Sequence, residues 1–264
     1  MRYFFVILAI LWAGIAQAAS IQILDIESGW SDARTVDVLG GNAELTFVDP
    51  NEMRWGRSWT GTGPRSGFRF EQLAEGTTQG AGQLFDVGRF THMNRVIFQG
   101  QHLDRATLNM RLTASFDGRI ETIDTAYIFT LLETPNFAQP CANGERNGVN
   151  SVGRPQPGGS ALNRNGCGDR VQLLQNPTVP RTFTHNGLEY QFELLGFASG
   201  PEFWTVEDLD NPILLTARFN VSGTPIVPPQ PPVEPPPIPL PAGAWFMLAG
   251  MGALALMRRR AKRA

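Results

Sequence analysis

The residues of this 264-residue chain whose types and spacing could most readily do chemistry are Thr91, His92 and Asn94, at the end of a strand-like segment. In one interpretation, the three side chains line a ligand site at the strand end. In the other, the imidazole and the amide fix a turn by hydrogen-bonding backbone groups. The residue types favour the second interpretation, and we predict no catalytic residue.

The sequence lacks residues that define several classes of enzyme. The only lysine is Lys262 in the C-terminal tail, which excludes a lysine nucleophile, a Schiff base or a phosphate-loop lysine from the rest of the chain. No Gly-x-Ser-x-Gly hydrolase elbow occurs, and His92, His102 and His185 are not spaced as a zinc site. A glycan hydrolase that uses paired carboxylates stays open, because residues 19–224 contain 23 Asp and Glu residues that sequence alone cannot pair.

An acidic segment offers oxygen ligands. Glu207, Asp208 and Asp210 precede the last predicted strand, and calcium prefers such carboxylate oxygens. Their spacing does not match an EF-hand loop, and a solvated acidic turn is the simpler interpretation. We therefore expect no obligatory cofactor, with calcium as the one ion to test.

Two tryptophans raise the question of sugar binding. Trp55 and Trp59 flank a segment rich in Gly, Ser and Thr. Indole rings can stack on sugar rings, but tryptophans are equally common in protein cores. The pair is a candidate glycan contact, and core packing is the alternative.

The two cysteines, Cys141 and Cys167, enclose a segment rich in Gly, Asn and Pro. A bridge between them would close a loop of about 25 residues and contribute roughly 3 kcal/mol by the chain-entropy estimate. We predict this disulfide; a reactive thiol pair is the alternative, although the CxxC spacing of redox motifs is lacking.

Both ends of the chain have the composition of targeting segments. Residues 1–18 combine an early arginine, a short apolar run and an Ala-x-Ala ending, which predicts a secretory signal peptide; an uncleaved anchor is the alternative. Residues 225–241 contain ten prolines, which predicts a polyproline II stalk of roughly 50 Å. Residues 242–257 are apolar and predict a transmembrane helix. The basic residues 258–264 should stay cytoplasmic.

Residues 19–224 are predicted to form one all-β domain. Residues 106–113 alternate apolar and polar side chains, so one face of that strand should be buried. Gly40-Gly41-Asn42 and His185-Asn186-Gly187 are hairpin signals. We expect an antiparallel β-sandwich, jelly-roll-like, with an open barrel as the alternative. The strand-like runs are 21–26, 35–40, 43–49, 84–92, 95–100, 106–116, 125–133, 170–175, 187–198 and 211–223.

The C-terminal tail resembles a known sorting signal. Residues 238–245, Ile-Pro-Leu-Pro-Ala-Gly-Ala-Trp, precede the apolar segment and an arginine cluster. This order is similar to the VPLPA-type tail of the PEP-CTERM class of bacterial proteins, with isoleucine in place of the first valine. The resemblance covers the last 27 residues; a permanent single-pass anchor is the alternative. It implies recognition by a membrane-embedded exosortase-type transpeptidase at Pro239, Leu240, Pro241 and Ala242.

The Thr-His-x-Asn segment carries a second resemblance. Arg54-Trp55-Gly56 and Ser66-Gly67-Phe68 lie upstream of it, and Phe203-Trp204-Thr205-Val206-Glu207 and Asn211 lie downstream. This order is similar to the THxN family of PEP-CTERM proteins, also described as the choice-of-anchor K domain, over most of residues 50–220. The resemblance implies an architecture and assigns no activity.

Charge and targeting together define the expected function. Residues 19–224 carry 16 basic and 23 acidic side chains, a net charge of about −7, which argues against nucleic-acid binding. We expect a protein that is exported, held in the membrane during sorting, and then retained in the envelope, at the surface or in the extracellular matrix. The expected role is a non-enzymatic binding module associated with extracellular polysaccharide. A secreted glycan hydrolase and a structural surface-coat subunit are the alternatives.

Overall fold

The computed structural model describes residues 20–37, 44–58, 61–98, 101–174 and 182–223. These residues form strands, turns and loops, without a helix among them. The strands are β1 (Ser20–Asp37), β2 (Thr46–Asp49), β3 (Glu52–Trp55), β4 (Ser66–Gln72), β5 (Thr78–Gly80), β6 (Leu84–Asn94), β7 (Gln101–Phe116), β8 (Arg119–Leu132), β9 (Asp169–Leu174), β10 (Thr182–His185), β11 (Leu188–Phe197), β12 (Glu202–Thr205) and β13 (Leu209–Gly223).

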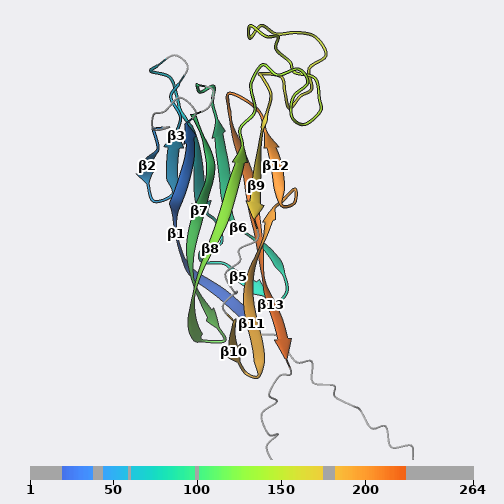
Figure 1. Ribbon diagram of the computed structural model, residues 1–264. Helices are drawn as coiled ribbons and strands as arrows, with labels where there is room; N and C mark the ends of the chain where they lie inside the picture. The colour runs from blue at the N-terminus through green and yellow to red at the C-terminus, as the bar shows by residue number, and fades with distance from the viewer. Residues whose placement is uncertain (1–19, 38–43, 59–60, 99–100, 175–181, 224–264) are drawn as a thin grey trace, which may run out of the picture. The chain divides into compact units, whose positions relative to one another are not determined.

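Two antiparallel sheets make up the fold (Figure 1). The first has six strands in the order β12-β9-β8-β7-β1-β5, and the second has seven in the order β10-β11-β13-β6-β4-β3-β2. Neighbouring described strands pair antiparallel in both sheets. The prediction of an all-β protein with two antiparallel sheets is confirmed.

The alternation predicted for residues 106–113 is present in β7. Ala106, Leu108, Met110 and Leu112 are buried, whereas the intervening side chains face outward. One of the outward residues, Arg111, makes an ion pair with β8. Because side chains of a strand alternate between faces, this pattern gives the six-stranded sheet one apolar face and one solvated face.

The apolar faces of the two sheets share one core rich in aromatic rings. Trp30 of β1 lies 5.5 Å from Phe68 of β4, centroid to centroid. Phe90 of β6 stacks on Phe129 of β8 at 5.1 Å, with the ring planes only 2° apart. These pairs each join one sheet to the other, so the layers are held by apolar burial and ring packing.

Two hairpins use two-residue turns. The β7–β8 turn has Asp117 and Gly118 at φ 49° and 91°, and the β10–β11 turn has Asn186 and Gly187 at φ 52° and 76°. Positive φ at both central residues is the requirement of the type I′ turn, which matches the twist of the flanking strands. The hairpin predicted at His185-Asn186-Gly187 is confirmed. Residues 40–42 lie outside the described part.

The segment between β8 and β9 is a long loop stabilised by a disulfide and by asparagines. Cys141 and Cys167 are bonded, as predicted. Asn147 Nδ2 donates to the carbonyl oxygens of Asn136 at 2.7 Å and Ala138 at 3.1 Å. In Figure 1 this yellow-green loop extends past the ends of the strands. Its last part leads directly into Asp169, the first residue of β9, and so fixes where that carboxyl lies.

The strands β3, β4, β5, β10 and β12 were not predicted, and two of the predicted runs differ from the structure. The runs 21–26 and 35–40 were predicted as two strands, but residues 21–26 and 35–37 belong to the single strand β1. A register shift after Ser31 and a positive φ at Asp32 mark a β-bulge, whose polar residues interrupt the apolar pattern. Residues 95–98, the described part of the run 95–100, are not a strand, and Ile97 makes an isolated bridge to Ser58.

The signal peptide, stalk, apolar helix and basic tail predicted for residues 1–18, 225–241, 242–257 and 258–264 lie outside the described residues. Within the described part of the chain, no helix has the length and hydrophobicity needed to cross a membrane.

Candidate functional site

The Thr-His-x-Asn motif lies at the end of β6, inside the seven-stranded sheet. His92 pairs with Phe68 of β4 on one side and with Asn211 of β13 on the other. Strand alternation places His92 and Asn94 on the same face as the core residue Phe90, whereas Thr91 and Met93 face the other way and are also buried. The motif is therefore interior, and His92 and Asn94 point toward the six-stranded sheet.

His92 is a buried, uncharged side chain. Its exposed fraction is 0%, and its ring lies parallel to Trp55 at 5.9 Å and edge-on to Phe68 at 5.3 Å. Burial, with a smaller contribution from the charge of Arg95, lowers the pKa of His92 to about 3. The imidazole is thus neutral near pH 7, because the charged form would lose its hydration.

The two polar side chains of the motif converge on Thr205, the last residue of β12 in the other sheet. His92 Nδ1 lies 3.0 Å from Thr205 Oγ1, and Asn94 Nδ2 donates to the same oxygen at 3.2 Å. Thr205 Oγ1 in turn donates to the carbonyl of Asp169 at 3.2 Å. Since a hydroxyl has one proton and here gives it to that carbonyl, His92 Nδ1 must carry a proton and donate. The motif is a hydrogen-bonded link between the two sheets.

Three carboxyl groups lie next to this link. Asp169 begins β9 opposite Thr205, Glu207 follows β12, and Glu133 follows β8. Asp169 and Glu207 are 0% exposed. One oxygen of Asp169 accepts from the backbone N–H of Thr134 at 2.8 Å. The other Asp169 oxygen, one oxygen of Glu133 and both oxygens of Glu207 are buried without a hydrogen-bond partner.

Burial raises the pKa of all three carboxyls, because a charged carboxylate loses hydration in the interior. The pKa of Asp169 rises to about 7 and that of Glu207 to about 9, whereas the pKa of Glu133 is raised well above its usual value. For Glu133 and Glu207 the nearby Asp169 charge adds to the rise. The contact between the Glu133 and Asp169 side chains further raises the pKa of Glu133 and lowers that of Asp169.

The Asn94 amide lies beside the carboxyl groups of Asp169 and Glu207. It lowers the pKa of Asp169 and of Glu207, opposing part of the effect of burial. Its Nδ2 donates to Thr205, and its Oδ1 is buried with no hydrogen-bond partner. Asn94 thus connects the motif to the carboxyls, and we call Asn94, Glu133, Asp169 and Glu207 the interior carboxyl cluster.

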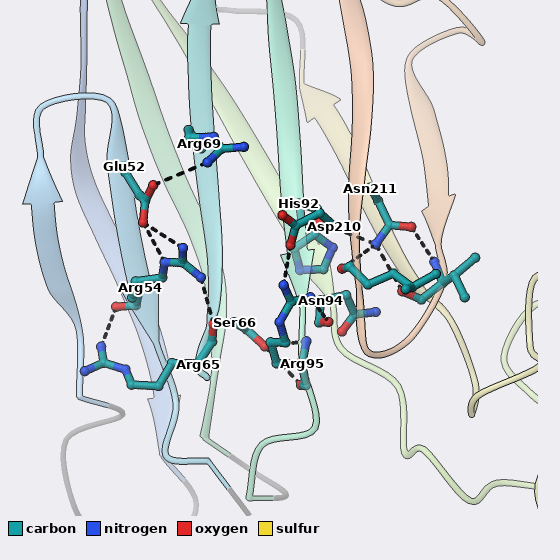
Figure 2. Close-up of polar contacts among 12 residues, drawn as sticks. Glu52, Arg54, Arg65, Ser66, Arg69, His92, Asn94, Arg95, Asp210 and Asn211 are labelled. Atoms are coloured by element: carbon teal, nitrogen blue, oxygen red, sulfur yellow. Dashed lines mark hydrogen bonds and ion pairs between the residues drawn. The ribbon is translucent and has the colours of Figure 1, made fainter. Parts of the chain in front are cut away.

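A tight turn directs Glu207 inward. Asn211 accepts from the backbone N–H of Val206 at 2.8 Å and donates to the carbonyls of Val206 and Leu209, both at 3.0 Å (Figure 2). Asn165 from the disulfide loop donates to the carbonyl of Glu207 at 2.9 Å. These bonds satisfy the turn's backbone and hold Glu207 on the core side.

The acidic residues predicted as calcium ligands do not share a site. Glu207 points into the core, Asp208 is exposed at φ 60°, and Asp210 makes an ion pair with Arg95 (Figure 2). An arginine-paired carboxylate at the surface and a carboxyl in the core cannot coordinate one ion. Within the described residues, no three His, Cys, Asp or Glu side chains, as they stand, form a group that could hold a metal ion.

Trp55 is part of the core, which overturns its interpretation as an exposed glycan contact. Its exposed fraction is 0%, and its ring packs edge-on against Phe68 at 4.8 Å and parallel to His92. A sugar ring cannot reach an indole in this position. Trp59 and the sorting residues Pro239, Leu240, Pro241 and Ala242 lie outside the described residues, so the predictions for them stand as made.

Sequence reasoning missed Glu133 and Asp169, and it named Thr205 only as part of the segment 203–207, without a role. For Asp169 a signal was present: it alternates in phase with Val171 and Leu173, both buried. A carboxylate in the core-facing phase of a strand is a strong indication of a buried polar site. The chain matches no model of a known protein family and no curated protein.

Proposed function

We propose that the chain is an exported protein of the cell envelope, surface or extracellular matrix, and that its β-domain binds extracellular polysaccharide without catalysing a reaction. In this proposal the two sheets form a jelly-roll-like sandwich on the proline-rich stalk 225–241. The helix 242–257 holds the protein in the membrane, with residues 258–264 on the cytoplasmic side, until an exosortase-type transpeptidase acts near Pro239–Ala242.

The observation that carries the non-enzymatic part is the burial of the THxN motif. His92, on which a catalytic interpretation would rest, is neutral, 0% exposed and bonded to Thr205. A general base must come within about 3.2 Å of a substrate proton. Here both sheets cover the imidazole, so the motif supports a role in building the domain rather than in a reaction.

The polysaccharide contact in this proposal is Trp204 rather than Trp55. Trp204 is half-buried on β12, an edge strand of the six-stranded sheet, and faces away from its core neighbour Phe203. The Arg170 guanidinium lies 5.9 Å from the indole centroid, and Arg170 also pairs with Glu202 at 3.6 Å. An aromatic face beside a cation and a carboxylate can stack on a sugar ring and hydrogen-bond its hydroxyls.

The hydrolase alternative rests on one specific observation, the proximity of Asp169, Glu207 and Glu133. Glycosidases use two carboxyls that flank the scissile bond, one of them with a raised pKa. Asp169 and Glu207 are, however, 0% exposed. A polysaccharide would reach them only if β12 or the disulfide loop moved, so we rank this function second.

The proposed localisation and processing are tested by the intact mass of the native protein after cell fractionation. We expect a mass that lacks residues 1–18 and the segment beyond Ile-Pro-Leu-Pro-Ala-Gly, in the envelope or medium fraction. A mass that retains the Arg-Arg-Arg-Ala-Lys-Arg-Ala end would make the protein a permanent membrane anchor, and the sorting part of the proposal would be wrong.

Binding is tested by co-sedimentation of the purified protein with extracellular polysaccharide from the producing organism. Trp204→Ala should weaken co-sedimentation at least tenfold, whereas Phe47→Ala, at an exposed ring on β2 in the other sheet, should leave it unchanged. Equal loss in both variants, or no binding by the wild type, would count against the proposal. Release of reducing ends from the same polysaccharide, lost in Asp169→Asn, would establish the hydrolase instead.

A further inference from the structure

The interior carboxyl cluster contains more oxygen acceptors than the protein supplies with donors. Five side-chain oxygens of the cluster are buried and have no hydrogen-bond partner: one each from Asn94, Glu133 and Asp169, and two from Glu207. Buried polar atoms in native proteins are nearly always paired with protein groups, water or an ion. Such a concentration of unpaired acceptors at one place therefore points to a ligand that accepts electron pairs.

The residues around the cluster do not supply a compensating positive charge. None of the described ion pairs includes Glu133, Asp169 or Glu207. His92, the titratable neighbour on β6, is neutral. Arg95 lowers the pKa of Glu207 from a distance, but its guanidinium is bonded to Asp210. Buried carboxyl groups are ordinarily ion-paired, bound to a metal or protonated. The described residues provide no ion pair here, so a proton and a metal ion compete for the same oxygens.

Asn94 is an independent indication of a ligand, because it is an uncharged side chain buried beside the same carboxyl groups. It is 0% exposed, its amide lies beside both Asp169 and Glu207, and its Oδ1 has no partner. A purely repulsive cluster of acids would gain nothing from a further unpaired carbonyl oxygen. A site for a hard cation would gain a neutral ligand.

We propose that the interior carboxyl cluster binds one calcium ion, with Asp169, Glu207 and Asn94 as ligands and Glu133 as an additional carboxylate. The donors are all oxygens, which selects a hard cation over zinc. They come from β6, the β8–β9 loop, β9 and the turn after β12, with no regular octahedral frame, which favours calcium over magnesium. The exposed Asp208 and the arginine-bound Asp210 are not ligands.

The affinity follows from how far the donors must move. Since the carboxyl groups do not yet stand in coordinating positions, the side chains must rotate to close around the ion. A site that is not preformed belongs at the weak end of protein calcium sites, with a Kd of roughly 10⁻⁴ to 10⁻³ M. Calcium at ten times the Kd then multiplies the folding equilibrium constant by about 11.

The test uses the native, disulfide-bonded protein after removal of divalent ions by a chelator. Its melting temperature is followed by near-UV circular dichroism from 0 to 10 mM calcium at constant ionic strength, with magnesium as the comparison ion. The protein's terbium luminescence, excited through tryptophan and displaced by calcium, reports binding without reference to stability. We expect a saturable rise in melting temperature, a midpoint of roughly 0.1–1 mM, and a smaller response to magnesium.

Two variants locate the site. Glu207→Gln keeps the shape of a protonated glutamate, so the domain still folds, and it should weaken terbium and calcium binding at least tenfold. Asp208→Asn is the matched control: it removes an exposed carboxylate one residue away, and asparagine tolerates the positive φ of 60° found there. It should bind like the wild type.

Two results would overturn the proposal. The first is a wild-type protein whose melting temperature and terbium signal are unaffected by 10 mM calcium. The second is the reverse pattern of variants, with binding lost in Asp208→Asn and retained in Glu207→Gln, which would place the ion in the surface turn.

Discussion

Replacing Glu207 with glutamine should remove much of the pH dependence of the protein's stability. In the folded protein, burial and the neighbouring carboxylates raise the pKa of Glu207 from 4.5 to about 9. Between these pH values the native state holds a proton that the unfolded chain has released. Stability conferred by this group is therefore highest below about pH 4.5 and falls as pH rises toward 9.

The magnitude follows from the width of that interval. Each pH unit above 4.5 costs about 1.4 kcal/mol, so the effect of Glu207 reaches about 3 kcal/mol at pH 7. Asp169, whose pKa is raised from 3.8 to about 7, adds a slope of the same sign below pH 7. Glutamine is uncharged at every pH, so the variant should equal the wild type near pH 5 and exceed its stability by about 3 kcal/mol at pH 7.

The assay is urea unfolding of both proteins from pH 5 to pH 8, under non-reducing conditions and in the presence of a chelator. Glu189→Gln, at an exposed glutamate of β11, controls for the loss of one negative charge. Parallel pH profiles for the wild type and Glu207→Gln would refute the reasoning, since they would mean that the Glu207 carboxyl ionises in the folded protein at no cost. A shift of the same size in Glu189→Gln would refute it as well.

Three further perturbations test other parts of the structure. Thr205→Val leaves the imidazole and amide donors of the motif unpaired and should cost about 2–4 kcal/mol by urea unfolding, whereas Thr182→Val, at an exposed position, should stay within about 0.5 kcal/mol. Reducing Cys141–Cys167 should cost about 3 kcal/mol and accelerate hydrogen exchange first in the loop that they close. Trp55→Ala should cost about 3–5 kcal/mol by thermal unfolding through the cavity it leaves, and the folded fraction should bind polysaccharide as before.

The features that could be predicted from the sequence are those set by neighbouring residues. Alternation over residues 106–113 identified β7, and a two-residue turn needing positive φ identified the Asn186-Gly187 hairpin. Strands of three or four residues, such as β5 and β12, are too short to establish a period of two. Their pairing is decided by the long strands beside them, so they are found only in the folded chain.

Of the residues at the candidate site, the sequence identified the motif side chains but not their partners. A polar motif in the core-facing phase of a strand singled out His92 and Asn94, but their common partner Thr205 is more than one hundred residues away. Spacing along the chain carries no information about such a pair, because it depends on which edge of the six-stranded sheet β12 joins. Trp55 illustrates the converse, since its polar sequence neighbours suggested exposure although β3 turns its ring inward.

The interior carboxyl cluster lies where β9, β12 and the disulfide loop meet. The charge of its carboxyl groups should therefore affect how well ordered these elements are. Asp169 and Thr205 face each other across β9 and β12, and Asn165 of the disulfide loop holds the backbone of Glu207. A proton or cation that leaves the cluster exposes these strands and the loop to the repulsion of buried carboxylates. Asp169 pairs with Thr205 of β12, the strand that carries the half-buried Trp204. Conditions that change the charge of the interior should therefore change the polysaccharide-binding surface that we propose, and a change of pH alone should alter co-sedimentation by the wild type more than by Glu207→Gln.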